Sequence, residues 1–406
     1  MSEWKTYRLE ELCTAKGSYG IGAPAVAYDA NKYTYLRITD INDDGTLNRN
    51  GLMSVDDEHA EDYILKENDI VFARTGNSTG RTYFYDGQDG ELVYAGFLIK
   101  FSLDSEKVNP RILKYYTHSQ PYYNWVRSFD TGGTRGNINA KVFGAMPITL
   151  PPRRQQDRIV EILKPLDDKI ELNRRINANL EAQAQALFRS WFVDNKTQNN
   201  NPGFFNNIIQ TTLSGDWGQE TPKGNYISEV YCIRGADIPD IKCGDKGKLP
   251  TRYILEKNLK NKKLSENDLV VEISGGSPTQ STGRICLITR ALLDRMGKDV
   301  ICTNFCRALK PIPDYSFFIY LYWQYLYNNN TMFSYENGTT GIKNLNITDF
   351  INKEPIIIPE KKKILEFNKV LQPIFDMIYK NGRENKRLSA LRDTLLPKLM
   401  AGNIRF

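Results

Sequence analysis

We predict an α/β protein in which two α/β units form a tandem repeat, separated by two long α-helices that pack as an antiparallel coiled coil. Three observations support this. The chain has 406 residues, about twice or more the usual size of one domain. Segments of the first half recur in the second half in the same order, and each half ends in a long helical stripe. A composition of 40% hydrophobic and 25% charged residues is typical of globular proteins and excludes disordered, collagen-like and mucin-like classes.

The repeat is visible in five short segments. Residues 36–41 (LRITDI) resemble 233–238 (IRGADI), residues 67–71 (ENDIV) resemble 266–270 (ENDLV), and both 79–81 and 282–284 are TGR. Further along, residues 132–139 (GGTRGNIN) parallel 338–346 (GTTGIKNLN), and 147–151 (PITLP) parallel 355–359 (PIIIP). The spacing between copies drifts slightly, which places insertions in loops.

Each copy ends in a predicted long helix. The apolar positions step mostly by three, four or seven, so they share one face of a helix. No Gly or Pro interrupts the sequence between Leu166 and Phe192, which predicts a rod of roughly 40 Å at about 1.5 Å per residue. The stripe positions Leu163, Leu166, Ile170, Leu180, Leu187 and Trp191 correspond to Leu371, Ile374, Ile378, Leu388, Leu395 and Leu399. Two such stripes in one chain predict that the helices bury each other.

Within each unit, strands and helices alternate. Short β-type runs at 69–74 and 268–273 precede Gly/Ser/Thr loops, and helical stretches follow near 109–128 and 313–328. The aromatic run at 315–327 is too short to cross a bilayer, and we interpret it as a core helix. The Asn-, Gly- and Pro-rich segment 195–224 predicts a connector, and the second unit lacks a clear equivalent of residues 4–9 (WKTYRL).

The net charge and the amino-terminal residues limit which classes of protein fit the sequence. The net charge of +6 permits nucleic-acid binding without requiring it. The opening MSEWK lacks an apolar segment and no run approaches 18 apolar residues, so we expect a cytoplasmic protein with reduced cysteines.

Motifs for catalysis are missing from the sequence. It has no G-x-x-x-x-G-K-[ST] phosphate loop, no cofactor glycine fingerprint and no Asn/Asp-Pro-Pro-aromatic segment of the kind that amino-methyltransferases use. His59 and His118 lie in no H-E-x-x-H motif, and we expect both to be structural. A zinc site is a weaker alternative to buried thiols for Cys232, Cys243, Cys302 and Cys306. We therefore expect a chain with no catalytic residues, no metal and no cofactor.

Two loops have the chemistry of a nucleic-acid contact. Residues 74–81 (RTGNSTGR) and 274–284 (SGGSPTQSTGR) combine glycines, hydroxyls, amides and arginine, and neither contains an acidic residue. Hydroxyls and amides bind phosphate, and Arg or Asn can pair with base edges. The alternative for either loop alone is a polar hairpin turn, and the recurrence in both copies favours DNA. The candidates are Arg74, Thr75, Asn77, Ser78, Thr79, Arg81, Ser274, Ser277, Thr279, Gln280, Ser281 and Arg284.

A second pair of loops, 131–138 and 337–344, has the same character and suits a clamp on the phosphate backbone. The alternative is a helix-capping turn before the β-run that follows. The candidates here are Thr134, Arg135, Asn137, Thr340, Lys343 and Asn344. Arg37 with Asp40, and Arg234 with Asp237, suit a structural salt bridge as well as a DNA contact, and we rank them lower.

Four segments carry a resemblance to a known family. Residues 187–194 (LFRSWFVD) and 395–404 (LLPKLMAGNI) look like two recurring helical regions, and 19–24 (YGIGAP) and 215–218 (GDWG) are similar too. On these segments the chain resembles, over nearly its whole length, the specificity subunits of type I restriction-modification systems.

The resemblance implies a noncatalytic subunit with two target-recognition domains, each of which reads one half of a bipartite DNA site, with the helices as a ruler. It implies double-stranded DNA and two methyltransferase subunits as partners. The methyltransferase subunits would hold S-adenosylmethionine and methylate adenine, and a restriction subunit would use ATP and Mg²⁺. We expect recognition domains at 1–150 and, with its linker, at 195–358, and spacer helices at 151–194 and 359–406.

Two alternatives belong to other classes of protein. A stand-alone DNA modification or cleavage enzyme would need the catalytic motifs that are missing. A scaffold that only joins proteins would not need the paired polar loops.

Overall fold

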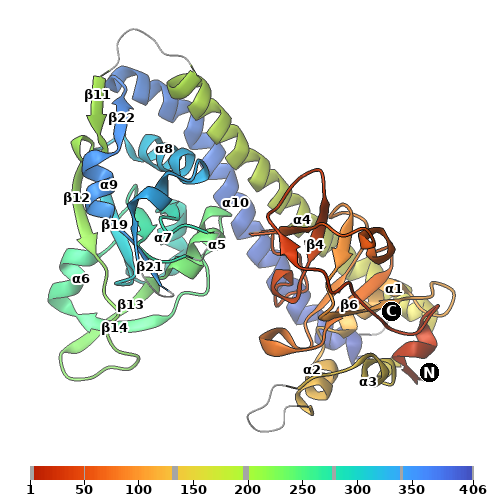
Figure 1. The fold of residues 1–406 in the computed structure, drawn as a ribbon. Coiled ribbons are helices and arrows are strands. Elements are labelled where there is room, and N and C mark those ends of the chain that lie inside the picture. The colour runs from red at the N-terminus through yellow and green to blue at the C-terminus, as the bar shows by residue number, and fades with distance from the viewer. Residues whose placement is uncertain are drawn as a thin grey trace. The chain divides into compact units, whose positions relative to one another are not determined.

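The computed structural model describes residues 4–49, 51–129, 136–194, 201–276, 280–338 and 342–404. The chain divides into two compact units. Unit 1 comprises residues 1–167 and 389–406, and unit 2 comprises residues 168–388 (Figure 1). Both units mix strands and helices, so the predicted α/β class is confirmed.

The described residues of unit 1 form three small sheets around an aromatic core. In pairing order the sheets are β1 (Lys5–Arg8) and β10 (Pro147–Leu150); β2 (Ser18–Tyr19), β9 (Leu98–Ser102), β6 (Asp69–Ala73) and β7 (Thr82–Phe84); and β3 (Ala25–Val26), β5 (Met53–Val55), β4 (Tyr33–Leu36) and β8 (Leu92–Tyr94). The short helices are α1 (Pro110–Tyr116), α2 (Gln120–Arg127) and α3 (Ala140–Gly144). In the core, the ring of Phe72 on β6 packs against Phe101 and Phe143, with ring centroids 5.7 and 4.8 Å away.

Four sheets form in the part of unit 2 that the structure describes. In pairing order they are β11 (Asn201–Phe204) and β22 (Pro355–Ile358); β12 (Ile209–Ser214), β19 (Cys306–Pro311), β15 (Leu269–Glu272) and β17 (Ile285–Leu287); β14 (Thr251–Leu255), β13 (Tyr226–Ile233) and β18 (Val300–Cys302); and β16 (Ser274–Gly275), β21 (Lys343–Leu345) and β20 (Glu336–Asn337). The short helices are α5 (Ile238–Lys242), α6 (Glu256–Lys262), α7 (Arg290–Met296) and α9 (Ile347–Lys353).

The aromatic run forms the central helix of unit 2. Helix α8 (Ser316–Asn328) buries Phe318, Tyr320 and Trp323 almost completely. The indole nitrogen of Trp323 donates a hydrogen bond to the carbonyl of Gly283, at 2.8 Å, so the ring satisfies its polar group inside the core. The interpretation as a core helix is confirmed.

Two long helices take part in both units. Helix α4 (Arg153–Phe188) continues as one π-helical turn to Asp194, and α10 (Lys361–Met400) is the last helix of the described residues. Within unit 2 they lie side by side and antiparallel (Figure 1): Lys363 at the start of α10 donates to the carbonyl of Trp191, while Asn381, further along α10, contacts Asn177. The predicted antiparallel packing is confirmed.

A buried polar layer fixes the register of these helices in unit 2. The Asn173 amide donates to the Asn385 amide oxygen at 2.8 Å, and the Asn381 amide donates to that of Asn177, also at 2.8 Å. Asn177 in turn donates to the carbonyl of Ile378, and both Asn173 and Asn177 are almost fully buried. Amides placed between two helices pair well in one register only, because a shifted register would leave them without partners.

Asn381→Ala should therefore lower the free energy of unfolding by about 1–3 kcal/mol, because it leaves the buried Asn177 oxygen without its donor. Urea denaturation of the purified chain measures the loss. Asn179→Ala is the matched control, since Asn179 is exposed on α4 and the substitution should leave stability unchanged within about 0.5 kcal/mol. Equal losses in both variants would contradict a special role for the layer.

The structure changes the interpretation of the segment that follows the first long helix. Residues 195–224 were predicted as a connector from their Asn, Gly and Pro content, yet 201–204 form β11, which pairs with β22 as β1 pairs with β10. Phe205, directly after β11, is fully buried, as is Leu9 directly after β1. Unit 2 therefore has a strand equivalent to the one in residues 4–9, although the two sequences differ. Pairing with the Ile-rich β22 holds this strand in place.

Candidate nucleic-acid interface

In unit 1 the two predicted loops meet at the end of β6. The backbone nitrogen of Arg74 donates to the carbonyl of Phe97, and its carbonyl accepts from the nitrogen of Ile138. The Thr79 hydroxyl donates to the carbonyl of Gly136 at 3.2 Å. Segments far apart in sequence, 74–81 and 136–138, therefore form one surface beside the turn that precedes β9.

Unit 2 repeats this backbone arrangement at the end of β15. The nitrogen of Ile273 donates to the carbonyl of Phe305, and its carbonyl accepts from the nitrogen of Leu345. The Ser274 hydroxyl donates to the amide oxygen of Asn344, and β16 pairs with β21. The two copies thus share a hydrogen-bonded framework around their polar loops.

The cations of these loops have carboxylate partners from elsewhere in the fold. Arg81 Nη2 lies 2.6 Å from a carboxylate oxygen of Asp43. Arg284 donates to both carboxylate oxygens of Glu272, at 2.8 and 2.6 Å, and these hydrogen bonds raise the pKa of its guanidinium. Lys343 Nζ lies 3.0 Å from Glu336. The loops contain no acid, as their sequences show, but the fold supplies one to each of these cations.

The remaining candidates differ in exposure. The Arg74 guanidinium lies over the Tyr19 ring, 5.1 Å from its centroid, and donates to the Asn137 amide oxygen at 3.3 Å. Asn77, Gln280 and Asn344 are exposed, Thr75 and Thr79 are half-buried, Ser274 is half-buried, and Ser78 and Ser281 are buried. Thr134, Arg135, Ser277, Thr279 and Thr340 lie outside the described residues. The assignment of these residues to DNA contact stays a prediction.

The two lower-ranked pairs are structural in the same way in both units. Arg37 donates through Nε and Nη2 to both oxygens of Asp40, at 2.8 and 2.7 Å, and Arg234 makes the same two bonds with Asp237. Each carboxylate also accepts from the backbone nitrogen of its arginine, and each arginine donates to a carbonyl, of Gly51 or of Lys248. The salt-bridge alternative accounts for all of these contacts.

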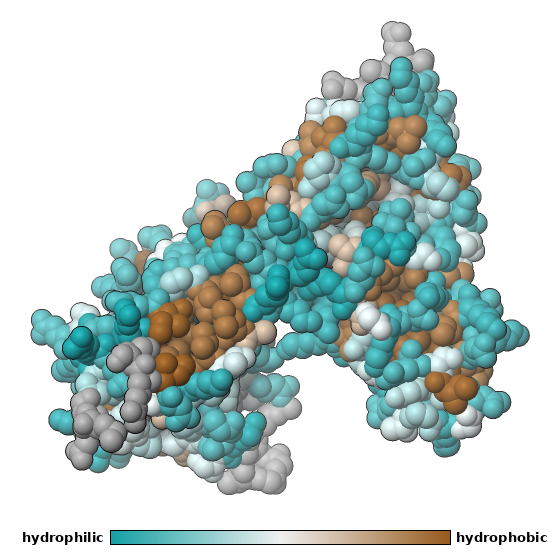
Figure 2. All heavy atoms as spheres, turned by 180° about the vertical axis from the view of Figure 1, so that it is seen from behind, coloured by the Kyte–Doolittle hydropathy of each residue, from teal (hydrophilic) through white to brown (hydrophobic). Residues whose placement is uncertain are grey.

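Sequence reasoning missed two exposed aromatic residues. Figure 2 shows hydrophobic side chains reaching the surface in separate patches on the face that it draws. Phe97 and Phe305 are 59% and 55% exposed, and each accepts the framework hydrogen bond described above through its carbonyl. Extending the repeat alignment to 95–97 and 303–305 would have paired them, because phenylalanine ends both segments.

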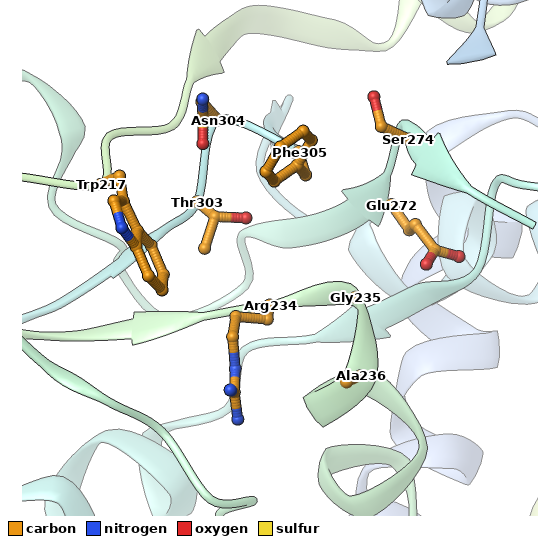
Figure 3. Close-up of a pocket in the computed structure, with 9 residues that line it drawn as sticks. All are labelled: Trp217, Arg234, Gly235, Ala236, Glu272, Ser274, Thr303, Asn304 and Phe305. Atoms are coloured by element: carbon orange, nitrogen blue, oxygen red, sulfur yellow. The ribbon is translucent and has the colours of Figure 1, made fainter. Parts of the chain in front are cut away.

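A cavity of about 370 Å³ lies next to Phe305 in unit 2 (Figure 3). Its wall combines aromatic rings with small polar side chains. The lining residues are Trp217, Arg234, Gly235, Ala236, Glu272, Ser274, Thr303, Asn304 and Phe305.

The cysteines considered as zinc ligands are free thiols, not disulfides, in the described residues. Cys232, Cys302 and Cys306 are buried, and burial raises the pKa of each thiol to about 12. Among the described residues, no three or more His, Cys, Asp and Glu side chains gather as a metal site would require.

The described helices include none that is both long enough and apolar enough to span a membrane.

The tandem units, the loop framework that each repeats and the paired helices together define a two-domain protein with two comparable polar surfaces. Residues 1–182 match the model of the type I restriction modification DNA specificity domain. The type I restriction enzyme HindI specificity subunit of Haemophilus influenzae is 26% identical, with an alignment that covers 100% of both chains. The MjaIX specificity subunit of Methanocaldococcus jannaschii is 24% identical over 72% of this chain and 68% of that protein.

A solved structure supports the fold independently. The crystal structure of a type I restriction-modification S subunit from M. genitalium aligns with a TM-score of 0.50 at 16% sequence identity, and the alignment covers 98% of this chain and 96% of that one. These findings confirm the resemblance predicted from the sequence.

Proposed function

We propose that this chain is the noncatalytic DNA-recognition subunit of a type I restriction-modification complex, in which each unit reads one half of a bipartite target. The observation that carries the proposal is the loop framework repeated in both units, at Arg74 and at Ile273. Two copies of one surface suit two half-sites, and the match of residues 1–182 to a DNA specificity domain supports DNA as the partner.

The partners and cofactors follow from the same proposal. Two methyltransferase subunits would bind this chain and hold S-adenosylmethionine, and restriction subunits would use ATP and Mg²⁺. The recognition domains would lie at 1–150 and 195–358 and the spacer helices at 151–194 and 359–406. We place the complex in the cytoplasm, where the DNA of its host would be accessible.

Methylome sequencing of a host with and without this gene tests the function. We expect one bipartite motif with methylated adenines to disappear when the gene is deleted and to return when it is restored. A methylome unchanged by the deletion would contradict the proposal. Methyl transfer by the isolated chain, abolished by a point mutation within it, would instead favour the stand-alone enzyme.

The ion pair of Arg81 with Asp43 allows a sharp test of the loop assignment. If Arg81 contacts DNA, Arg81→Ala should weaken binding of the assembled complex by about 1–3 kcal/mol, whereas Asp43→Asn should preserve or strengthen it by releasing the guanidinium. If the pair only holds the loop, both variants should weaken binding alike. Titration with target duplex at several salt concentrations separates the two results, because loss of a phosphate contact also lowers the salt slope.

A further inference from the structure

The two units differ where their frameworks are otherwise equivalent. In unit 1 the nitrogen of Ile21 donates to the carbonyl of Tyr94, and in unit 2 the nitrogen of Asp216 donates to the carbonyl of Cys302. These two equivalent hydrogen bonds show which residues of the two units correspond. The next residue is Gly22 in unit 1 and Trp217 in unit 2. Counting on from Tyr94 and Cys302, Gly96 corresponds to Asn304, and Phe97 to Phe305.

Unit 2 therefore has an indole at the position where unit 1 has Gly22. Trp217 and Phe305 both line the cavity, and in Figure 3 they lie on either side of Thr303 and Asn304. The guanidinium of Arg252 stacks on the Trp217 ring, 3.7 Å from its centroid, and Arg252 is itself buried and paired with Glu220 at 3.0 Å. Since Arg252 does not line the cavity, it holds the indole from outside and leaves it available as a rigid wall.

The polar groups of the cavity point to a ligand with a hydrogen-bonding edge. Thr303 is 1% exposed, so it forms part of the wall without offering its hydroxyl to a ligand. The Asn304 amide adds a donor and an acceptor to the same cavity. Glu272 is occupied by its two bonds with Arg284, and its charge is thereby compensated.

We propose that this cavity takes a nucleobase that has left the base stack, from the half-site read by unit 2. This proposal rests on the proposed DNA-recognition function. Protruding side chains reach base edges inside a duplex, whereas a concave site can receive only a group that projects from the DNA. Aromatic rings stack on the faces of an extruded base, and polar side chains bond to its edge. Ser274 lines the cavity and also belongs to the loop framework, so the cavity is continuous with the proposed interface.

The test uses the complex of this chain with its methyltransferase subunits and duplexes that carry the motif found by methylome sequencing. 2-Aminopurine replaces each adenine of both half-sites in turn, because it still pairs with thymine and its fluorescence rises when it leaves the base stack of the duplex. We expect a rise at one position in one half-site that is distinct from the adenine to be methylated. Phe305→Ala should abolish this rise and weaken binding by about 5- to 150-fold, the range for loss of one stacked base.

Two matched variants control for folding and for position. Phe305→Tyr keeps the ring and should keep the fluorescence rise. Phe97→Ala removes the equivalent exposed ring of unit 1, where Gly22 replaces the second wall, and should leave the rise unchanged. The inference is overturned if the wild-type complex binds without such a rise, or if Phe305→Ala leaves both the rise and the affinity unchanged. Failure of the wild-type complex to bind its motif would overturn the proposed function as well.

Discussion

Asp167→Ala should lower the free energy of unfolding of unit 1 by about 3–5 kcal/mol, the range for breaking a buried ion pair. The Asp167 carboxylate, 8% exposed, lies 3.0 Å from Lys114 Nζ on α1 and 3.1 Å from Arg392 Nη1 on α10. Asp167 itself is on α4, so one carboxylate ties three helices of unit 1 together. Its removal leaves Lys114 without this partner in a poorly hydrated site and releases Arg392 from α4.

The matched control for this prediction lies on the same helix. Arg158 and Glu161 on α4 form an ion pair at 2.8 Å in which both side chains are 61% exposed. Glu161→Ala should change stability by no more than about 0.5 kcal/mol, because water already solvates both charges. Urea denaturation of the two variants measures the difference. Similar losses for Asp167→Ala and Glu161→Ala would show that burial adds nothing to the triad.

The same triad predicts a pH dependence of stability. Burial alone would raise the pKa of Asp167, but Lys114 and Arg392 outweigh it and hold the pKa below its ordinary value. The ionised carboxylate therefore stabilises the folded state fully above about pH 4, and this contribution is lost as the pH falls through the lowered pKa of the folded state. The stability difference between the wild-type chain and Asp167→Asn should accordingly shrink below about pH 4, as measured by urea denaturation at a series of pH values.

Elements with a strong local pattern could be predicted from the sequence. The apolar stripe between Leu166 and Phe192 predicts the long helix, and the aromatic run predicts α8. In both cases the helical period of the apolar positions decides which side chains are buried. Pro165 did not end α4, which begins at Arg153, and α10 likewise continues through Pro373. Packing against the core of each unit outweighs the local cost of proline there.

Features that depend on distant residues could not be predicted. The segment 201–204 contains Asn, Pro and Gly and becomes a strand only because β22 is there to pair with it. Neither loop sequence contains an acidic residue, but Arg284 is paired with Glu272 on the preceding strand, and Arg81 with Asp43 from another part of unit 1. The cavity beside Phe305 was likewise beyond local patterns, since residues from 217 to 305 line it.

The division between the units marks the positions at which we would lengthen the helices. Glu181 accepts hydrogen bonds from Tyr320 and Gln324, so the part of α4 around Glu181 is fixed to the core of unit 2. The division falls after Asp167 in α4 and after Leu388 in α10. Additions at both points would keep the Asp167 triad inside unit 1 and the asparagine layer inside unit 2.

Inserting four helix-forming residues at each of these two points should lengthen the recognised spacer by one or two base pairs and leave both half-sites unchanged. Four residues add about 6 Å and slightly more than one helical turn, so the apolar stripes still face each other. That length corresponds to roughly two base pairs at about 3.4 Å each. Methylome sequencing of a host that carries the variant reads the spacer directly. The same insertion in α4 alone should abolish methylation, because it shifts one stripe against the other. A double-insertion variant that stays active on the original spacer would show that the helices do not set the distance between half-sites.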